Sequence, residues 1–237
     1  MTSYLKALDD VQNYDDVEDE RVLSSIGVSF GFEGKGKELF IGHYPKQVHG
    51  TAVVEASDST HHDEHRVQAD GIYTQNPSVK IGVQTADCVP ILLASEDKKV
   101  VMALHAGWRG LTAGIVGLGV KQLKKLHPNA MIYAAIGPSI AHCHYEVGLD
   151  VVEALDSESL GLNVRQLAYA LTKGVGDRWF LDLPTVGIFA LLQAGLQSKH
   201  ISVFHSCTYC KSEKWHSFRR DKEKSVRNWS WIQSDSV

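Results

Sequence analysis

Three short segments of the chain place potential metal ligands where β-strands are expected to end. His49 lies in "YPKQVHG", Cys88 lies in "IGVQTADCVPILLA", and His105 lies in "VVMALHAGWRG". Two imidazole nitrogens and one thiolate, with a fourth position left open, form a ligand set suited to catalytic zinc. The separations are long, so no spacing rule groups the three residues. Taken singly, His49 fits a surface histidine and Cys88 a buried thiol, and both alternatives stay open.

The residues after His105 are typical of an anion-binding turn. Gly107 and Gly110 flank Trp108 and Arg109 just before a predicted helix. Backbone N–H groups at a helix N-terminus, together with a guanidinium, bind anions well. The simpler alternative is that the glycines only permit a tight turn, with Trp108 in the core. Gly107 and Arg109 are therefore candidate substrate-binding residues.

Two more polar residues lie close in sequence to the possible ligands. Lys46 precedes His49 by three positions and is a weaker candidate for binding phosphate. Asp87 directly precedes Cys88, and carboxylates beside metal sites commonly orient a ligand or move a proton. Cys88, His105 and Asp87 are accordingly the candidate catalytic residues.

A further group of possible ligands lies in "HSCTYC", which contains His205, Cys207 and Cys210, and His216 follows it. A C-x-x-C pair with nearby histidines occurs in structural zinc sites and in redox pairs. A single pair is a weak signal, because the second pair of a zinc ribbon is missing. The favoured interpretation is a turn with half-buried thiols.

The segment "IGPSIAHCHYEVG" combines a possible site wall with three more metal-like residues. Gly137 and Ser139 follow an apolar strand, and we expect their backbone to face the substrate. The tripeptide "HCH" (142–144) offers three ligands, but neighbours in an extended chain point to opposite sides, so at most two can converge. Tyr145 and Glu146 could bind substrate or anchor the turn before the next helix, and a structural role for "YEV" is the favoured interpretation.

Composition excludes several classes of protein. The 237 residues are 43% hydrophobic and 22% charged, with a net charge of −4, which argues against a nucleic-acid partner. The cationic run 219–224 is interleaved with acids and is interpreted as a solvated face. No apolar run is long enough to span a membrane. We expect a cytoplasmic protein whose four cysteines are thiols or metal ligands.

Hydrophobic patterns predict one α/β (α+β) domain over 21–237, with mixed β-sheets flanked by helices, after an acidic and possibly mobile arm at 1–20. Strands are expected at 22–32, 39–44, 51–56, 70–74, 80–86, 88–94, 99–106, 130–137, 200–206 and 226–233. Helices are expected at 111–127, 149–156 and 183–196.

Six motifs occur in the order found in the YfiH-like, or laccase-domain, family. They are "KQVHG", "ADGIYT", "TADCVPILL", "ALHAGWRG", "AIGPSI" with "YEVG", and "CTYC" with "HSFRRD". The sequence therefore resembles this family from about residue 42 to its end. It departs from the family at "IGVSFGFEGKGKELFIGHYP", which stands in place of a longer, arginine-containing segment.

The resemblance implies a fold similar to the catalytic domain of cytotoxic necrotizing factor. It also implies a purine nucleoside phosphorylase acting on adenosine, inosine, guanosine and methylthioadenosine, with adenosine deaminase activity. By the same resemblance, zinc is held by His49, Cys88 and His105. The partners are then a nucleoside and phosphate.

Three alternatives remain open at this point. Polyphenol oxidation with copper is disfavoured, because multicopper oxidases use several H-x-H pairs and this chain has one. A hydrolase could use Cys88 as nucleophile with His105 as base. A metal-stabilised binding module without catalysis would instead have four protein ligands and no open position.

Overall fold

The central element of the structure is a six-stranded mixed sheet. In the computed structural model, which describes residues 21–37, 40–57, 60, 66–224 and 226–234, the strand order is β11-β7-β5-β6-β3-β2. The bounds are β2 Val53–Glu55, β3 Gly71–Thr74, β5 Val89–Ser95, β6 Val101–Ala106, β7 Ile132–Ile136 and β11 Ile201–Val203. The pairs β2–β3 and β7–β11 are parallel, whereas the others are antiparallel. The predicted mixed sheet system is thus confirmed.

The strand β5 is buried along its whole length, and its side chains enter two different cores. Val89, Ile91 and Leu93 pack into one apolar cluster, whereas Leu92 and Ala94 pack into the other. Successive side chains of a strand point to opposite faces, so a continuous apolar run is suited to a sheet that is covered on both sides.

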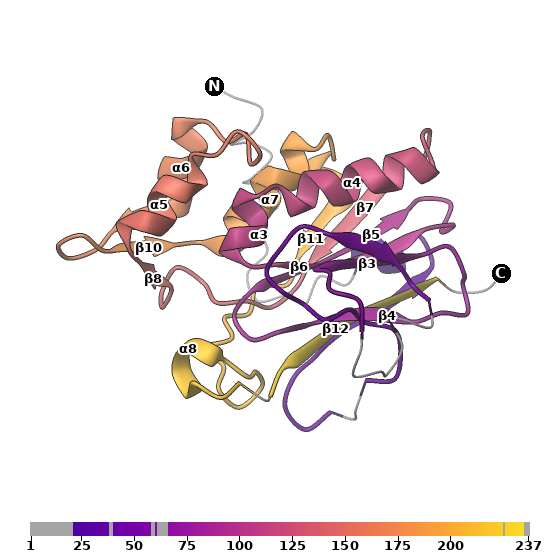
Figure 1. The fold of residues 1–237 in the computed structure, drawn as a ribbon, viewed down its shortest axis with the longest axis horizontal. Helices are drawn as coiled ribbons and strands as arrows, with labels where there is room; N and C mark the ends of the chain where they lie inside the picture. The colour runs from indigo at the N-terminus through magenta and orange to yellow at the C-terminus, as the bar shows by residue number, and fades with distance from the viewer. Residues whose placement is uncertain (1–20, 38–39, 58–59, 61–65, 225, 235–237) are drawn as a thin grey trace.

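Helices cover one face of this sheet (Figure 1). They are α3 Trp108–Thr112, α4 Ile115–Leu126 and α7 Leu183–Gln193. The single helix predicted over 111–127 is two helices, because Gly114 adopts a left-handed conformation with φ of 84° between them. The N-terminus of α7 is capped by the Asp182 side chain, which accepts a hydrogen bond from the Thr185 amide.

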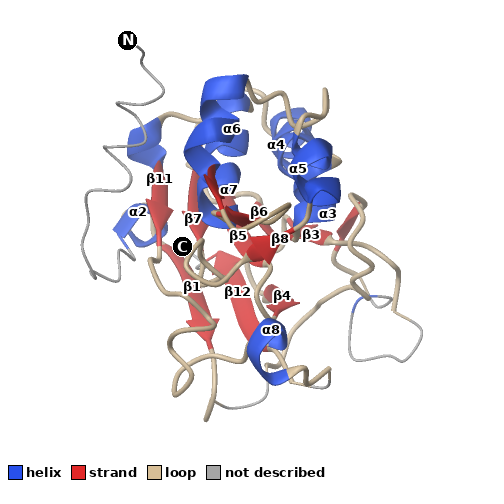
Figure 2. Ribbon diagram, turned by 90° about the vertical axis from the view of Figure 1, so that its left-hand side faces the viewer, coloured by secondary structure: helices blue, strands red, loops and turns tan. Residues whose placement is uncertain are grey.

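A three-stranded antiparallel sheet lies on the opposite side of the central sheet, as Figure 2 shows. Its order is β1-β12-β4, with β1 Val28–Glu33, β4 Ile81–Thr85 and β12 Asn228–Ser234. The strand β12 lies between β1 and β4, so the C-terminal segment of the fold pairs with segments from its first half. The short helix α2 (Arg21–Ser24) precedes β1 and packs against it.

The remaining elements lie around these two sheets. They are β8 Glu146–Val147, α5 Leu149–Leu155, α6 Val164–Ala170, β9 Leu171–Lys173, β10 Trp179–Leu181, the 3-10 helix η2 Ser198–His200 and α8 Phe218–Asp221. Of these, the sequence predicted only α5. The strand predicted at 39–44 is wrong in its described part, where His43 forms an isolated bridge with Ile81.

Within the described ranges, no helix combines the length and apolar character needed to cross a membrane. The acidic segment 1–20, predicted as an arm, lies outside the described residues.

Candidate metal centre

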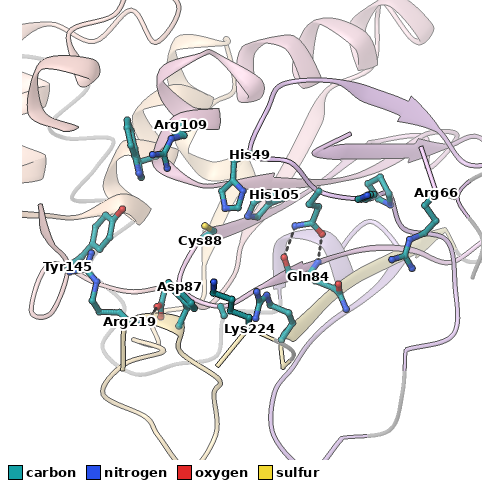
Figure 3. Close-up of a pocket in the computed structure, with 17 residues that line it drawn as sticks. His49, Arg66, Gln84, Asp87, Cys88, His105, Arg109, Tyr145, Arg219 and Lys224 are labelled. Carbon is teal, nitrogen blue, oxygen red and sulfur yellow. Dashed lines mark hydrogen bonds between the residues drawn. The ribbon is translucent and has the colours of Figure 1, made fainter. Parts of the chain in front are cut away.

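The structure brings together the three predicted metal ligands from separate parts of the fold. His49 lies on the loop before β2, Cys88 directly precedes β5, and His105 lies near the end of β6. Their potential ligand atoms all lie within 4.8 Å of one another, and the two imidazole rings meet edge to face with centroids 4.8 Å apart. Figure 3 shows the three side chains at the centre of a pocket. Two nitrogens and one sulfur at this separation fit a metal ion with an open coordination position.

Close backbone approaches make this convergence possible. His49 and Asp87 both have positive φ, 61° and 88°, which turns the chain sharply just at or before a ligand. Gly107 packs against the ligands themselves: a Cβ there would lie 2.9 Å from the Cys88 Sγ and 3.3 Å from the His49 ring. The absence of a side chain at Gly107 therefore leaves room for the ligands, a role beyond the anion binding predicted for it.

Asp70 holds two of the ligands, and the sequence did not single it out. This fully buried carboxylate accepts a hydrogen bond from His105 Nδ1 at 2.8 Å and from the His49 amide at 2.9 Å. The amides of Val48 and Gly50 donate to its second oxygen, at 3.2 and 2.6 Å. Because Nδ1 of His105 is bonded to the carboxylate, Nε2 is the ring nitrogen left for a metal. The sequence signal that could have pointed to Asp70 is an Asp directly before a fully buried strand, in "ADGIYT".

The electrostatics of the site favour a charged pair of side chains. Burial by itself raises the pKa of the Cys88 thiol, but the charges of and hydrogen bonds from His105 and His49 outweigh it and lower the pKa to about 6. Burial also lowers the pKa of His105, but the Cys88 thiolate and the Asp70 carboxylate raise it to about 9. The pKa of Asp70 is lowered, because its hydrogen bonds to His105 and to the backbone exceed the effect of burial. A thiolate is the form of cysteine that binds metals.

The pocket around these ligands has a volume of about 620 Å³ and is rich in cations. Its basic lining residues are Lys46, Arg66, Arg109, Arg219, Lys224 and Arg227. Asp87 is the one carboxylate among the described lining residues. In Figure 3, Arg109 lies above the ligands, and Lys224 and Arg219 lie below them. A pocket with this excess of positive charge suits an anionic ligand such as phosphate.

Arg109 and Lys46, the predicted phosphate-binding residues, both line the pocket that contains the ligands, and phosphate binding by them stays a prediction. The guanidinium of Arg109 lies over the Trp108 ring, 4.3 Å from its centroid. The helix α3 has only five residues, so its dipole is small and the Arg109 guanidinium is the stronger group for binding an anion. Gly137 and Ser139 do not line this pocket, and Ser139 lines a second one. Substrate contacts by these two residues stay a prediction.

Asp87 links the ligand segment to the C-terminal part of the chain. Its Oδ1 accepts a hydrogen bond from Thr208 Oγ1 at 2.7 Å, and its Oδ2 accepts one from the Arg219 amide at 2.6 Å. These contacts fix the segment that carries Arg219 against the metal centre. A part in moving protons stays a prediction for Asp87.

The sequence analysis missed a whole wall of the pocket. The run 219–224 is not simply a solvated face: Arg219 and Lys224 line the pocket, and Arg220 donates to backbone carbonyls, including that of Thr208 at 2.7 Å. Tyr145, for which a structural role was favoured over substrate binding, also lines the pocket, and burial together with the Cys88 charge raises the pKa of its phenol. The distance along the chain hid these roles, since local pattern carries no information on such contacts.

The segments "HCH" and "CTYC" meet in a second cluster of potential ligands. Cys143, His144, Cys207 and Cys210 have their ligand atoms within 4.8 Å of one another. Two members of the tripeptide converge, which agrees with the upper limit set from the sequence. His205, by contrast, lines the pocket beside Ser139.

The sequence and the fold assign the chain to a family. Residues 37–235 match the model of the multi-copper polyphenol oxidoreductase laccase family, and the chain belongs to that family. Its solved neighbours include the YfiH protein of Bacillus licheniformis, with a TM-score of 0.73 and 28% identity over 81% of this chain and 73% of that one. YlmD of Geobacillus stearothermophilus has a TM-score of 0.71 and 30% identity, covering 82% and 73%. The resemblance to YfiH-like proteins and the predicted fold class are thereby confirmed.

Curated relatives carry the name of an enzyme. The chain is 35% identical over 189 residues to a purine nucleoside phosphorylase of Aquifex aeolicus, covering 80% of each chain. It is 33% identical over 177 residues to the purine nucleoside phosphorylase YfiH of Escherichia coli, covering 75% of this chain and 68% of that one.

Proposed function

We propose that this protein is a zinc-dependent purine nucleoside phosphorylase that also deaminates adenosine. The observation that carries the proposal is the placement of the His49–Cys88–His105 set inside a pocket lined by six cations. The names of the curated relatives support the phosphorylase activity. Adenosine, inosine, guanosine and methylthioadenosine are the proposed substrates, and a cytoplasmic location is part of the same proposal.

The ligand set fits zinc better than copper. One thiolate and two imidazoles are common zinc ligands, and the Asp70 carboxylate binds Nδ1 of His105, which leaves Nε2 for the metal. A bound zinc ion would supply a Lewis acid at the open fourth position.

The cationic wall is suited to holding phosphate for attack. Phosphorolysis forms a bond between a phosphate oxygen and C1′ of the ribose and breaks the bond from C1′ to purine N9. The electron pair of the broken bond goes to the purine, which takes up a proton. Arg109, Arg219 and Lys46 line the pocket and are the proposed groups that bind and orient the phosphate. Their charge would offset that of the phosphate and of the ribose 1-phosphate product.

The aromatic part of the pocket is suited to the purine. Trp108, Tyr145 and Phe218 line it and offer faces on which a base can stack. Because the pKa of Tyr145 is raised, its phenol stays protonated at neutral pH and can donate a hydrogen bond to the nucleoside. Deamination replaces the C6 amino group with oxygen from water and releases ammonia. Asp87 borders the pocket and is the proposed group for moving a proton in that reaction.

The test is an assay of purified, zinc-loaded protein with each nucleoside, with and without phosphate. Phosphorolysis requires phosphate and yields a free base with ribose 1-phosphate, whereas deamination yields inosine from adenosine without phosphate. Loss of both activities on chelation and recovery with zinc are expected. If the loaded protein forms none of these products while a control phosphorylase does, the proposal is wrong.

One observation favours a second candidate, a hydrolase that uses Cys88 as nucleophile. The pKa of Cys88, lowered to about 6, and that of His105, raised to about 9, favour a thiolate beside an imidazolium when no metal is bound, and Asp70 orients the ring, as in cysteine hydrolases. This candidate predicts activity in metal-free protein and a covalent adduct on Cys88 during turnover. The phosphorylase predicts neither, so mass spectrometry of metal-free protein mixed with substrate separates the two.

A further inference from the structure

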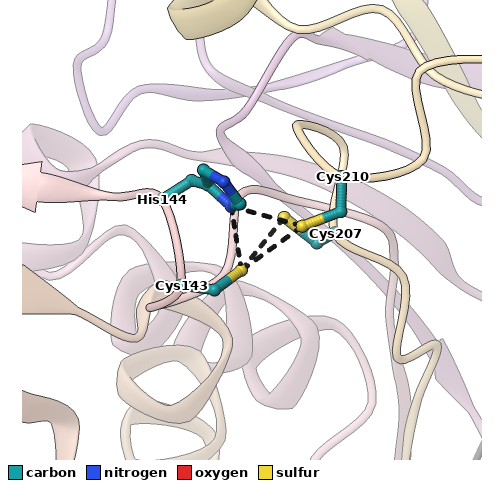
Figure 4. A group of neighbouring side chains, drawn as sticks. All are labelled: Cys143, His144, Cys207 and Cys210. Atoms are coloured by element: carbon teal, nitrogen blue, oxygen red, sulfur yellow. Dashed lines mark hydrogen bonds between the residues drawn. The ribbon is translucent and has the colours of Figure 1, made fainter.

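The cluster of Cys143, His144, Cys207 and Cys210 shares no residue with the first metal centre. Cys143 and His144 lie on the loop after β7, and Cys207 and Cys210 lie on the loop after β11 (Figure 4). Four such ligands from two segments match the Cys₃His composition of structural zinc sites. We propose that these four residues bind a second, structural zinc ion.

Four separations within the cluster are close to those of a tetrahedron around zinc. With Zn–S bonds of about 2.3 Å and Zn–N bonds of about 2.0–2.1 Å, tetrahedral geometry places two sulfurs about 3.8 Å apart and a sulfur and a nitrogen about 3.6 Å apart. The Cys143 Sγ lies 3.7 Å from the Cys207 Sγ and 3.5 Å from the Cys210 Sγ. Nδ1 of His144 lies 3.2 Å from the sulfurs of Cys143 and Cys210. Each separation agrees with a shared ion to within a few tenths of an ångström.

The surroundings of the sulfurs and the ring support a metal site over a disulfide. The Cys207 sulfur accepts a hydrogen bond from the Ala141 amide at 3.5 Å, which helps to fix its position. The His144 ring stacks on the Tyr209 ring at a centroid distance of 4.0 Å, which fixes the direction of Nδ1. A disulfide would join two of the three sulfurs and leave the third thiol and the imidazole without a function, whereas a metal uses all four groups.

A zinc ion here would join two loops that shape the catalytic pocket. The loops already meet at an isolated bridge between Ser139 and Cys207, and the Thr208 amide donates to the Ser139 carbonyl at 3.0 Å. Thr208 in turn binds Asp87, and Tyr145 follows His144 directly. The ion would therefore hold the pocket wall in place without touching the substrate. Its four protein ligands leave no open position, so the proposed role is structural and does not rest on the proposed function.

The experiment measures zinc per chain in protein purified under reducing conditions. We expect about two zinc ions in the unaltered protein, about one in Cys143→Ser and about one in the double variant His49→Ala/Cys88→Ala. The matched control is His142→Ala, the exposed neighbour on the same loop, which should keep about two. One zinc in the unaltered protein, lost in the double variant, would overturn the proposal.

Cobalt substitution of the double variant keeps the test decisive if Cys143→Ser does not fold. That variant retains all four proposed ligands. It should bind one cobalt ion with the visible absorption of a tetrahedral site and an intense thiolate-to-metal band, and added phosphate should leave both unchanged. No cobalt binding, an octahedral spectrum, or peptide mapping that finds Cys143 joined to Cys207 or Cys210 would each overturn the proposal.

Discussion

Asp70→Asn tests whether one buried carboxylate holds the metal centre together. Each oxygen of Asp70 accepts two hydrogen bonds: Oδ1 from His105 Nδ1 and the His49 amide, and Oδ2 from the amides of Val48 and Gly50. An asparagine has nearly the same shape but only one acceptor oxygen. With its NH₂ group toward Val48 and Gly50, the amide faces two donors. With its NH₂ group toward His49 and His105, it faces the His49 amide and a ring nitrogen that accepts only if its proton moves to Nε2, the nitrogen left for the metal.

The cost can be estimated from these contacts. Either orientation leaves at least one part-buried donor without an acceptor, which costs about 1–3 kcal/mol of stability. For a chain of 237 residues this lowers the melting temperature by about 2 °C or more. Loss of the carboxylate behind a metal-binding histidine weakens metal affinity by about 10–100-fold, or about 1.4–2.8 kcal/mol.

Zinc binding at this centre alone can be followed through Cys88. Free zinc is set with a chelator buffer, and occupancy is measured as protection of Cys88 from alkylation by peptide mass spectrometry. Calorimetry gives the melting temperature. The matched control is Asp97→Asn, which changes charge equally at a half-exposed carboxylate bonded to Ser95 Oγ at 2.7 Å. It should leave zinc protection of Cys88 unchanged.

A clear result would refute this reasoning. If Asp70→Asn binds zinc within about twofold of the unaltered protein and melts at the same temperature, the carboxylate neither orients His105 nor holds the turn before it. A loss of stability with unchanged zinc affinity would limit its role to the backbone turn.

Three more predictions address the same pocket. Gly107→Ala should weaken zinc binding at least tenfold with the fold retained, since the added Cβ would lie 2.9 Å from the Cys88 sulfur. The control is Gly117→Ala, whose Cβ would have no neighbour within 4 Å. It should bind zinc normally and gain about 0.5–1 kcal/mol of stability. In metal-free protein, the alkylation rate of Cys88 should rise through a midpoint near pH 6 and level off above it, because the thiolate is the reactive form and the pKa of the thiol is about 6. A rate that keeps rising up to pH 9.0, the ordinary pKa of a cysteine thiol, would contradict this prediction. Arg109→Ala should raise KM for phosphate about tenfold or more with unchanged zinc content. Arg165 is exposed on α6, so Arg165→Ala should leave this KM unchanged. An equal KM for phosphate in both variants would exclude the Arg109 guanidinium from the phosphate site.

Strand prediction succeeded where the local pattern had one physical cause. The runs that became β5 and β6 are apolar, β-rich and bounded by turn residues, and both are buried on two faces of the central sheet. The sequence did not predict the helix α6 or the strands β8 to β10, which are short elements whose segments carry no strong periodicity. The segment 39–44 has strand-like composition, but it pairs only through an isolated bridge at His43 in its described part. Composition alone therefore did not establish a ladder there.

The sequence by itself determined which groups can bind a metal and that His49, Cys88 and His105 lie at or near β-segments. Their types and their local context are short-range properties, which a single sequence displays. Only the tertiary structure decided what surrounds them. Asp70 directly precedes β3, and it reaches His105 because β3 pairs with β6. The backbone carbonyl of Asp70 continues this pairing by accepting a hydrogen bond from the His105 amide.

The C-terminal wall of the pocket and the second cluster of potential ligands also form through pairing of strands that are distant in the sequence. Arg219 meets Asp87, 132 residues earlier, because β12 inserts between β1 and β4 and returns the end of the chain to the metal centre. Cys143 meets Cys207 because β7 and β11 run parallel, so the loops that follow them leave the same edge of the sheet. Strand pairing over such distances is set by packing of the whole core and leaves no local pattern in the sequence, so these contacts became visible only in the folded chain.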